Sequence, residues 1–77
     1  MHRALSARQE AILGFISGYR SEYPFAPTVR DIQEGLGVSS TSVVEYNLNI
    51  LERRGYIRTW PGQARAIEVL KLHSEGG

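Results

Sequence analysis

Apolar residues recur at helical spacing in the first third of the chain. They lie three or four positions apart, at Ile12, Phe15, Ile16, Tyr19 and Tyr23. Such spacing places them on one face of an α-helix. Ser6 and Gln9 precede this stripe in the form of a capping box, in which each side chain pairs with a backbone N–H that the helix leaves unpaired. Since Pro24 and Pro27 cannot continue a helix, the pattern predicts about four helical turns between Ser6 and Pro24.

A second, shorter helix is predicted over residues 28–36. Thr28 and Asp31 repeat the spacing of a capping box. Three apolar residues follow at helical spacing, namely Val29, Ile32 and Leu36. Gly37 comes next, and a glycine there can take the left-handed conformation that ends a helix and turns the chain. A tight glycine turn before a further helix is typical of a helix-turn-helix unit.

The third predicted helix has two faces of opposite character. Ser39 or Ser40 is its expected N-terminal cap, and Gly55 ends it. The apolar face consists of Val44, Leu48 and Leu51, and the polar face of Ser42, Glu45, Tyr46 and Asn49. Hydroxyl, amide and carboxylate groups on an outward face can form hydrogen bonds that discriminate between bases. This face therefore suits the reading of base edges in the DNA major groove.

Two β-strands are predicted after the third helix. They cover residues 56–59 and 66–70, where β-branched and aromatic residues are frequent, and residues 60–65 form the turn between them. Three helices followed by a hairpin make a mainly helical fold with a small β-hairpin. The predicted fold is a winged helix-turn-helix.

Length and composition limit the chain to one small domain. A folded chain of 77 residues buries only ~60% of the surface that its unfolded form exposes, too little for two cores. We expect the domain over residues 1–70, and a tail or the start of a linker over residues 71–77. The chain has no cysteine and no apolar run long enough to span a membrane. A cytoplasmic protein without a membrane segment is expected.

Charge is distributed unevenly along the chain, although the net value is only +1. Residues 28–51 are net acidic and residues 52–77 are net basic. The clustering favours phosphate contacts beyond the third helix, whereas a solvated surface is the alternative for any single arginine. His2 and His73 have no partner at metal-ligand or catalytic spacing, and no nucleophile elbow or phosphate loop is present. We expect no catalytic residue, no metal and no cofactor.

A set of collinear residues carries a family resemblance from about residue 3 to residue 70. The matching positions are residues 4–9, Pro27, Thr28, Ile32, Leu36, Gly37, Ser40, Glu45, Leu48, Leu51, Gly55, Ile57, Gly62, Arg65 and Ile67. The Leu-Ser-x-Arg-Gln opening and the Pro-Thr pair before the second helix are the most specific of them. In these features the chain resembles the N-terminal DNA-binding domain of the LexA repressor family.

The resemblance implies a bacterial transcription repressor that binds double-stranded DNA at a palindromic operator as a homodimer. It also implies regulation of DNA-damage (SOS) genes by operator occlusion. The positions that face bases in the family correspond to Ser40, Ser42, Val43, Glu45 and Tyr46. The family commonly has Asn-Ala in place of Ser42-Val43 and an acidic residue in place of Tyr46, so we expect a different operator sequence. The family's self-cleaving C-terminal domain is not part of these 77 residues, so we expect no self-cleavage from them; they represent either an excised domain or a stand-alone regulator.

Five residues are expected to contact the DNA backbone. They are Arg8, Thr28, Arg30, Arg54 and Arg65. We expect a monomer free in solution, because one internal core uses the apolar stripes and no stripe is left for a dimer. The alternative function is a winged-helix protein–protein interaction module, since fold alone does not determine function. Such a module would usually expose a larger apolar patch on the third helix, with fewer arginines around it.

Overall fold

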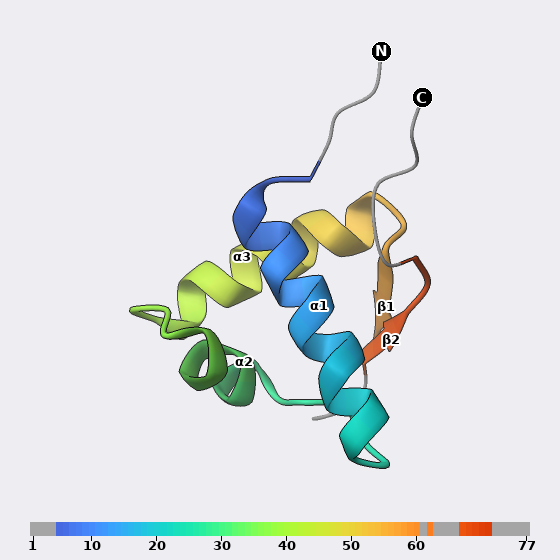
Figure 1. Ribbon diagram of the computed structural model, residues 1–77. Helices are drawn as coiled ribbons and strands as arrows, with labels where there is room; N and C mark the ends of the chain where they lie inside the picture. Colours follow the sequence, from blue (N-terminus) through green and yellow to red (C-terminus); the bar gives the residue numbers. More distant parts are fainter. Residues whose placement is uncertain (1–4, 61, 63–66, 72–77) are drawn as a thin grey trace.

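The computed structural model describes residues 5–60, 62 and 67–71, and it contains three helices and a two-stranded sheet. The elements are α1 (Ala7–Glu22), α2 (Val29–Leu36), α3 (Thr41–Arg53), β1 (Ile57–Thr59) and β2 (Ile67–Val69). The three helices pack against one another, and the hairpin closes the side of α1 and α3 away from α2 (Figure 1). The predicted fold class, mainly helical with a small hairpin, is confirmed.

Two capping boxes fix the starts of α1 and α2. The Ser6 N–H donates to Gln9 Oε1, and the Gln9 N–H donates to Ser6 Oγ, both at 3.1 Å. Thr28 and Asp31 make the same reciprocal pair at 3.0 Å. Both predicted boxes are confirmed, and each satisfies two backbone groups that a helix end leaves unpaired.

The turn between α2 and α3 follows the predicted glycine. Gly37 has φ 68° and ψ 32°, in the left-handed region. The Val38 N–H donates to the Gln33 carbonyl at 3.0 Å, which closes the turn. Ser40 occupies the N-cap position of α3, as one of the two predicted serines, but its side chain makes no capping hydrogen bond. The cap position is therefore confirmed and the capping interaction is not present.

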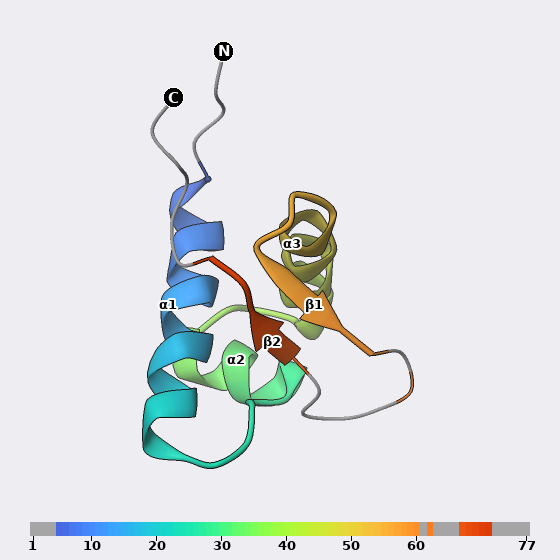
Figure 2. The same cartoon turned by 90° about the vertical axis from the view of Figure 1, so that its right-hand side faces the viewer.

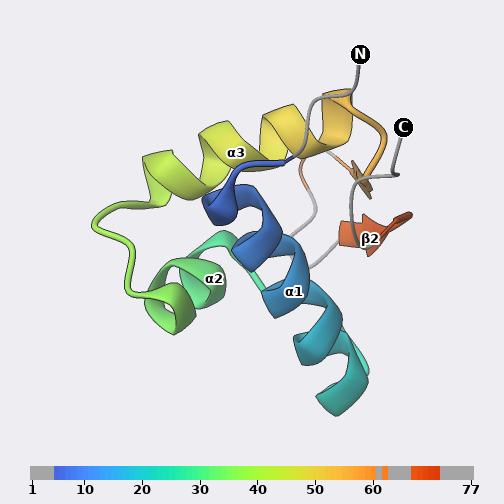
Figure 3. The ribbon, with the colours of Figure 1, turned by 45° about the horizontal axis from the view of Figure 1, so that its top comes forward.

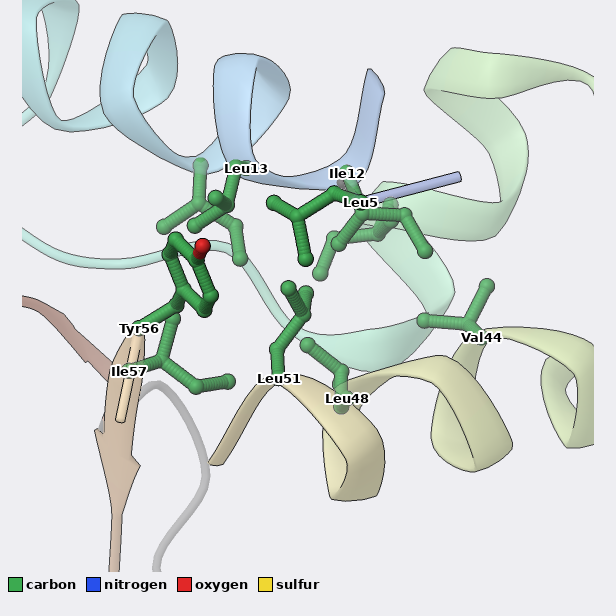
Figure 4. Packing of buried hydrophobic residues seen from close by; sticks show 10 residues of the cluster. Leu5, Ile12, Leu13, Val44, Leu48, Leu51, Tyr56 and Ile57 are labelled. Atoms are coloured by element: carbon green, nitrogen blue, oxygen red, sulfur yellow. The ribbon is translucent and has the colours of Figure 1, made fainter. Parts of the chain in front are cut away.

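One hydrophobic core joins all three helices and the hairpin (Figure 4). Its buried members are Leu5, Ile12, Leu13, Ile16, Ile32, Val44, Leu48, Leu51, Tyr56 and Ile57. The predicted inner face of α3 is buried, whereas the α1 stripe needs two corrections. Leu13 is fully buried and was not predicted, because α1 packs against α3, α2 and the hairpin and so buries more than one stripe. Tyr23 is 44% exposed, since it lies beyond the last turn of α1.

A close approach between α1 and α2 depends on a glycine. The ring of Phe15 lies directly over Gly35, so that a Cβ at this position would overlap the ring. Gly14 and Gly18 on α1 are exposed, and a Cβ at either would meet no atom within 4 Å. Of these three glycines, Gly35 alone is required by packing.

The hairpin is antiparallel and lies beside both α1 and α3 (Figure 2). Ile57 pairs with Val69 and Thr59 with Ile67. The strands are shorter than the predicted 56–59 and 66–70, and residue 66 lies outside the described residues. Tyr56 precedes the first strand, and its carbonyl accepts from the N–H groups of residues 70 and 71, at 2.7 and 3.2 Å. These two hydrogen bonds join the residues that follow β2 to the turn between α3 and β1.

Within the described residues, no helix combines the length and apolar character that a membrane crossing requires. The predicted boundary between a domain over residues 1–70 and a tail over residues 71–77 stays a prediction, because residues 72–77 lie outside the described part of the chain.

Candidate nucleic-acid interface

Helix α3 lies along one edge of the molecule, with α1 and α2 on its inner side (Figure 3). Its outer face presents the four predicted polar residues, Ser42, Glu45, Tyr46 and Asn49, and all four are exposed. Tyr46 has 67% of its surface exposed. The predicted division of α3 into a buried apolar face and an exposed polar face is confirmed.

Two further residues predicted to face bases are only partly exposed. Ser40 is half-buried at the N-cap of α3. Val43 is half-buried one turn before Asn47, whose Nδ2 donates to the Val43 carbonyl at 2.8 Å. Both residues nevertheless lie at the N-terminal end of α3, close to the exposed Ser42. The structure thus gathers all five predicted base-facing positions in the first two turns of the helix.

The residues predicted to contact the DNA backbone come from three different helix ends. Arg8 is exposed in the first turn of α1, and Arg30 is exposed in the first turn of α2. Thr28 is the half-buried N-cap of α2, where its Oγ1 accepts from the Asp31 N–H. A helix N-terminus carries a partial positive charge that attracts phosphates. The start of α2 combines this charge with a hydroxyl and an arginine, next to the Asp31 carboxylate that accepts from the Thr28 N–H.

Further basic groups lie at the C-terminal end of α3 and beside it. Arg54 is the half-buried C-cap of α3, and its guanidinium carbon lies 5.9 Å from the centroid of the Tyr56 ring. The Lys71 ammonium lies 4.9 Å from the same ring. The buried tyrosine thus brings two cations together beside the start of the hairpin. Arg65, the fifth predicted backbone contact, lies outside the described residues.

A carboxylate that the sequence analysis did not single out links α3 to the hairpin. Glu52 accepts two hydrogen bonds from Thr59, one from its N–H at 3.1 Å and one from its hydroxyl at 2.8 Å. Glu52 lies in the last turn of α3, and Thr59 ends β1. The pair therefore holds the outgoing end of β1 against α3.

Sequence reasoning also missed a buried polar contact between α1 and α3. Gln9 Nε2 donates to Asn47 Oδ1 at 3.2 Å, and each residue is only 8% exposed. The sequence did contain a signal, because Asn47 is a polar residue at helical spacing from Val44 and Leu51 on the apolar face. A polar residue at such a position is normally buried with a hydrogen-bond partner.

Three helices, a glycine turn before an exposed polar helix, and a C-terminal hairpin define a winged helix-turn-helix domain. Comparison with protein families agrees with this class. The family model described as the LexA DNA binding domain matches residues 2–66. The chain therefore belongs to the LexA DNA-binding domain family.

Curated relatives carry the same family name. The chain is 49% identical over 68 residues to a LexA repressor of Roseiflexus sp. (strain RS-1), a match that covers 88% of this chain and 31% of the relative. It is 47% identical over 68 residues to a LexA repressor of Shouchella clausii, with 88% and 33% covered. A LexA repressor of Geobacter metallireducens is 44% identical over 66 residues, with 86% and 33% covered. The chain thus spans about a third of the length of these relatives.

Proposed function

We propose that this domain binds double-stranded DNA sequence-specifically and acts as the DNA-binding part of a LexA-type transcription repressor. The observation that carries the proposal is the outer face of α3, which is polar and exposed while the inner face of the same helix is buried. A helix presented in this way fits the major groove, which admits one α-helix. Membership of the LexA DNA-binding domain family supports the same role.

Base recognition is assigned to the first two turns of α3. Serine hydroxyls at positions 40 and 42 can donate or accept hydrogen bonds, and the Val43 methyl groups can contact a thymine methyl. Glu45 can accept a hydrogen bond from a cytosine amino group, which is the pairing that a carboxylate favours in the major groove. Tyr46 adds a ring and a hydroxyl at a position that is 67% exposed.

Backbone contacts are assigned to basic and hydroxyl groups around α3. Arg8, Thr28 and Arg30 lie at the starts of α1 and α2, whereas Arg54 lies at the end of α3. Arg65 is retained from the sequence analysis as a fifth contact. Because α3 itself carries few cations on its outer face, these flanking groups would supply most of the attraction to phosphates. In this proposal, the outer face of α3 recognises the bases, and residues outside that face attract the phosphates.

Two copies of the domain are proposed to bind one palindromic operator, each copy on one half-site. Repression would follow from occlusion of the promoter, with DNA-damage-response genes as the regulated set, in the bacterial cytoplasm. The relatives named LexA repressor support the repressor role. No catalytic residue, metal or cofactor is part of this proposal.

Selection of bound sequences from a random DNA pool tests the proposal. We expect a palindrome whose half-site centres lie about one helical turn, or a multiple of it, apart. Sedimentation of the free domain at micromolar concentration should show a monomer. A pool without sequence enrichment would contradict sequence-specific binding, and an absence of any DNA binding would favour a protein–protein interaction module. A stable dimer of the free domain would contradict assembly on the operator.

A further inference from the structure

Three hydrogen bonds in series connect the start of α1 with the middle of α3. The Ser6 N–H donates to Gln9 Oε1 at 3.1 Å, Gln9 Nε2 donates to Asn47 Oδ1 at 3.2 Å, and Asn47 Nδ2 donates to the Val43 carbonyl at 2.8 Å. The two amide side chains are nearly buried, at 8% exposure each. We call these two residues the amide brace.

The direction of this series is fixed by its two ends. A backbone N–H can only donate and a backbone carbonyl can only accept. Gln9 must therefore turn its oxygen toward Ser6 and its nitrogen toward α3, and Asn47 must turn its oxygen toward α1 and its nitrogen toward Val43. Neither amide can flip without leaving a nearly buried polar group unpaired. The brace thus has one stable arrangement.

Apart from the Glu52–Thr59 hydrogen bonds at its C-terminal end, the inner-face contacts of α3 in the described residues do not supply such directionality. Val44, Leu48 and Leu51 are apolar, and burial of apolar surface is non-directional. An apolar face opposes large rotations of a helix, which would expose it to water, but a small rotation about the helix axis breaks no directional contact among apolar side chains. The amide brace adds a directional contact in the middle of the inner face, and therefore restrains that rotation.

We infer that the amide brace is a positioning device for base recognition, although neither of its residues lies on the outer face of α3. The inference rests on the proposed DNA-reading role of α3. Glu45 and Tyr46 precede Asn47 directly, so any rotation of α3 would turn both side chains away from the bases that they read. Recognition side chains must be held within a narrow range of positions and angles by the residues that support them.

The amide brace also fixes the position of α3 relative to a residue that is proposed to contact the DNA backbone. Arg8 is adjacent to Gln9 in the first turn of α1. Fixing Gln9 against Asn47 therefore sets the position of Arg8 relative to α3. The phosphate contact of Arg8 and the base contacts of α3 would then keep a fixed position relative to each other on the DNA.

Two variants remove the brace from opposite sides. Asn47→Leu keeps the number and branching of the side-chain heavy atoms and loses both hydrogen bonds of the α3 residue. Gln9→Glu keeps the capping box, because a carboxylate still accepts from the Ser6 N–H, but it cannot donate to Asn47. Since Gln9 lies 38 residues from Asn47 in the sequence and on another helix, an effect on base preference from both variants points to the contact between them.

Leu13→Ala is the matched control. Leu13 is a fully buried core residue on α1 that makes no hydrogen bond of the brace, so we expect Leu13→Ala to lower stability and to leave both amide hydrogen bonds in place. We expect Asn47→Leu and Gln9→Glu each to reduce the ratio of operator to single-base-variant affinity by about tenfold. Binding to random DNA should be almost unchanged in Asn47→Leu and weaker in Gln9→Glu, because the added carboxylate lies next to Arg8. Leu13→Ala should keep that ratio, measured at a temperature where every variant is folded. A ratio that falls equally in all three variants, or in none, would overturn the inference.

A measurement without DNA separates this inference from the proposed function. Residual dipolar couplings of backbone amides report the orientation of α3 relative to α1 in the free domain. We expect them to change for α3 in Gln9→Glu and in Asn47→Leu, and to stay at wild-type values in Leu13→Ala. Unchanged couplings in both brace variants would overturn the positioning role. Changed couplings in a domain whose wild type prefers no sequence would contradict the proposed function and leave the brace intact as a device that orients α3.

Discussion

The inner and outer faces of α3 differ in almost every physical property although they share one helix. The inner face is apolar and buried, with Val44 and Leu51 fully inaccessible to solvent. The outer face is polar and exposed, with Tyr46 at 67% exposure. The difference indicates that the residues of the inner face determine the stability of the fold. The residues of the outer face contribute little to stability, so their identity can be set by the molecule that they contact.

The largest effect is expected when the inner face is truncated. Leu51→Ala should lower the free energy of unfolding by about 2–5 kcal/mol, because it removes buried methyl groups and leaves a cavity. Urea denaturation measures this loss. Asn49→Ala on the outer face should stay within about 0.5 kcal/mol of the wild type. Equal losses in the two variants would contradict the division of α3 into two faces.

Alanine substitutions of two glycines extend the comparison between buried and exposed positions to the contact of α1 with α2. Gly35→Ala places a methyl group into the Phe15 ring and should destabilise the domain by about 1–3 kcal/mol, since the ring must move out of its packed position. Gly18→Ala on the open side of α1 should stabilise it by up to about 1 kcal/mol, because alanine favours the helix. Thermal denaturation of both variants gives the comparison. Stabilisation by Gly35→Ala would show that Phe15 does not pack there as described.

Local signals made most of the fold predictable. The capping boxes at Ser6 and Thr28 and the left-handed Gly37 each depend on a few neighbouring residues, so the sequence alone indicates them. The outer face of α3 was predictable for the same reason, because periodicity is a local property. Tyr23 was assigned to the inner stripe wrongly, since periodicity does not show where a helix passes beyond the body of the protein.

Contacts between elements were not predictable from these signals. The Gln9–Asn47 hydrogen bond and the packing of Phe15 on Gly35 depend on how two helices cross, which only the folded arrangement determines. The Glu52–Thr59 pair likewise depends on the course of the chain after α3. Five candidate base contacts were brought together at the N-terminal end of α3, and their role in DNA recognition stays a prediction.

A smaller effect is expected from the basic residue at the end of α3. Arg54→Ala should weaken binding to all sequences alike and reduce the slope of log K against log salt by about one unit, if its guanidinium contacts one phosphate. Titrations at several salt concentrations measure the slope. Arg20→Ala, an exposed arginine in the last turn of α1, is the control and should keep the full slope. A full slope in Arg54→Ala as well would exclude Arg54 as a phosphate contact.

The proposed reading of bases by the outer face of α3 can be tested at a single carboxylate, Glu45. A carboxylate close to polyanionic DNA is repelled unless it accepts a hydrogen bond, and Glu45→Gln removes the charge while it keeps the shape. Binding of wild type and variant should be compared on the selected operator, on each single-base variant and on random DNA. We predict that preference at one operator position relaxes by about 1–3 kcal/mol while binding to random DNA improves. An equal rise in affinity for every sequence, with preference unchanged, would contradict base reading by this face.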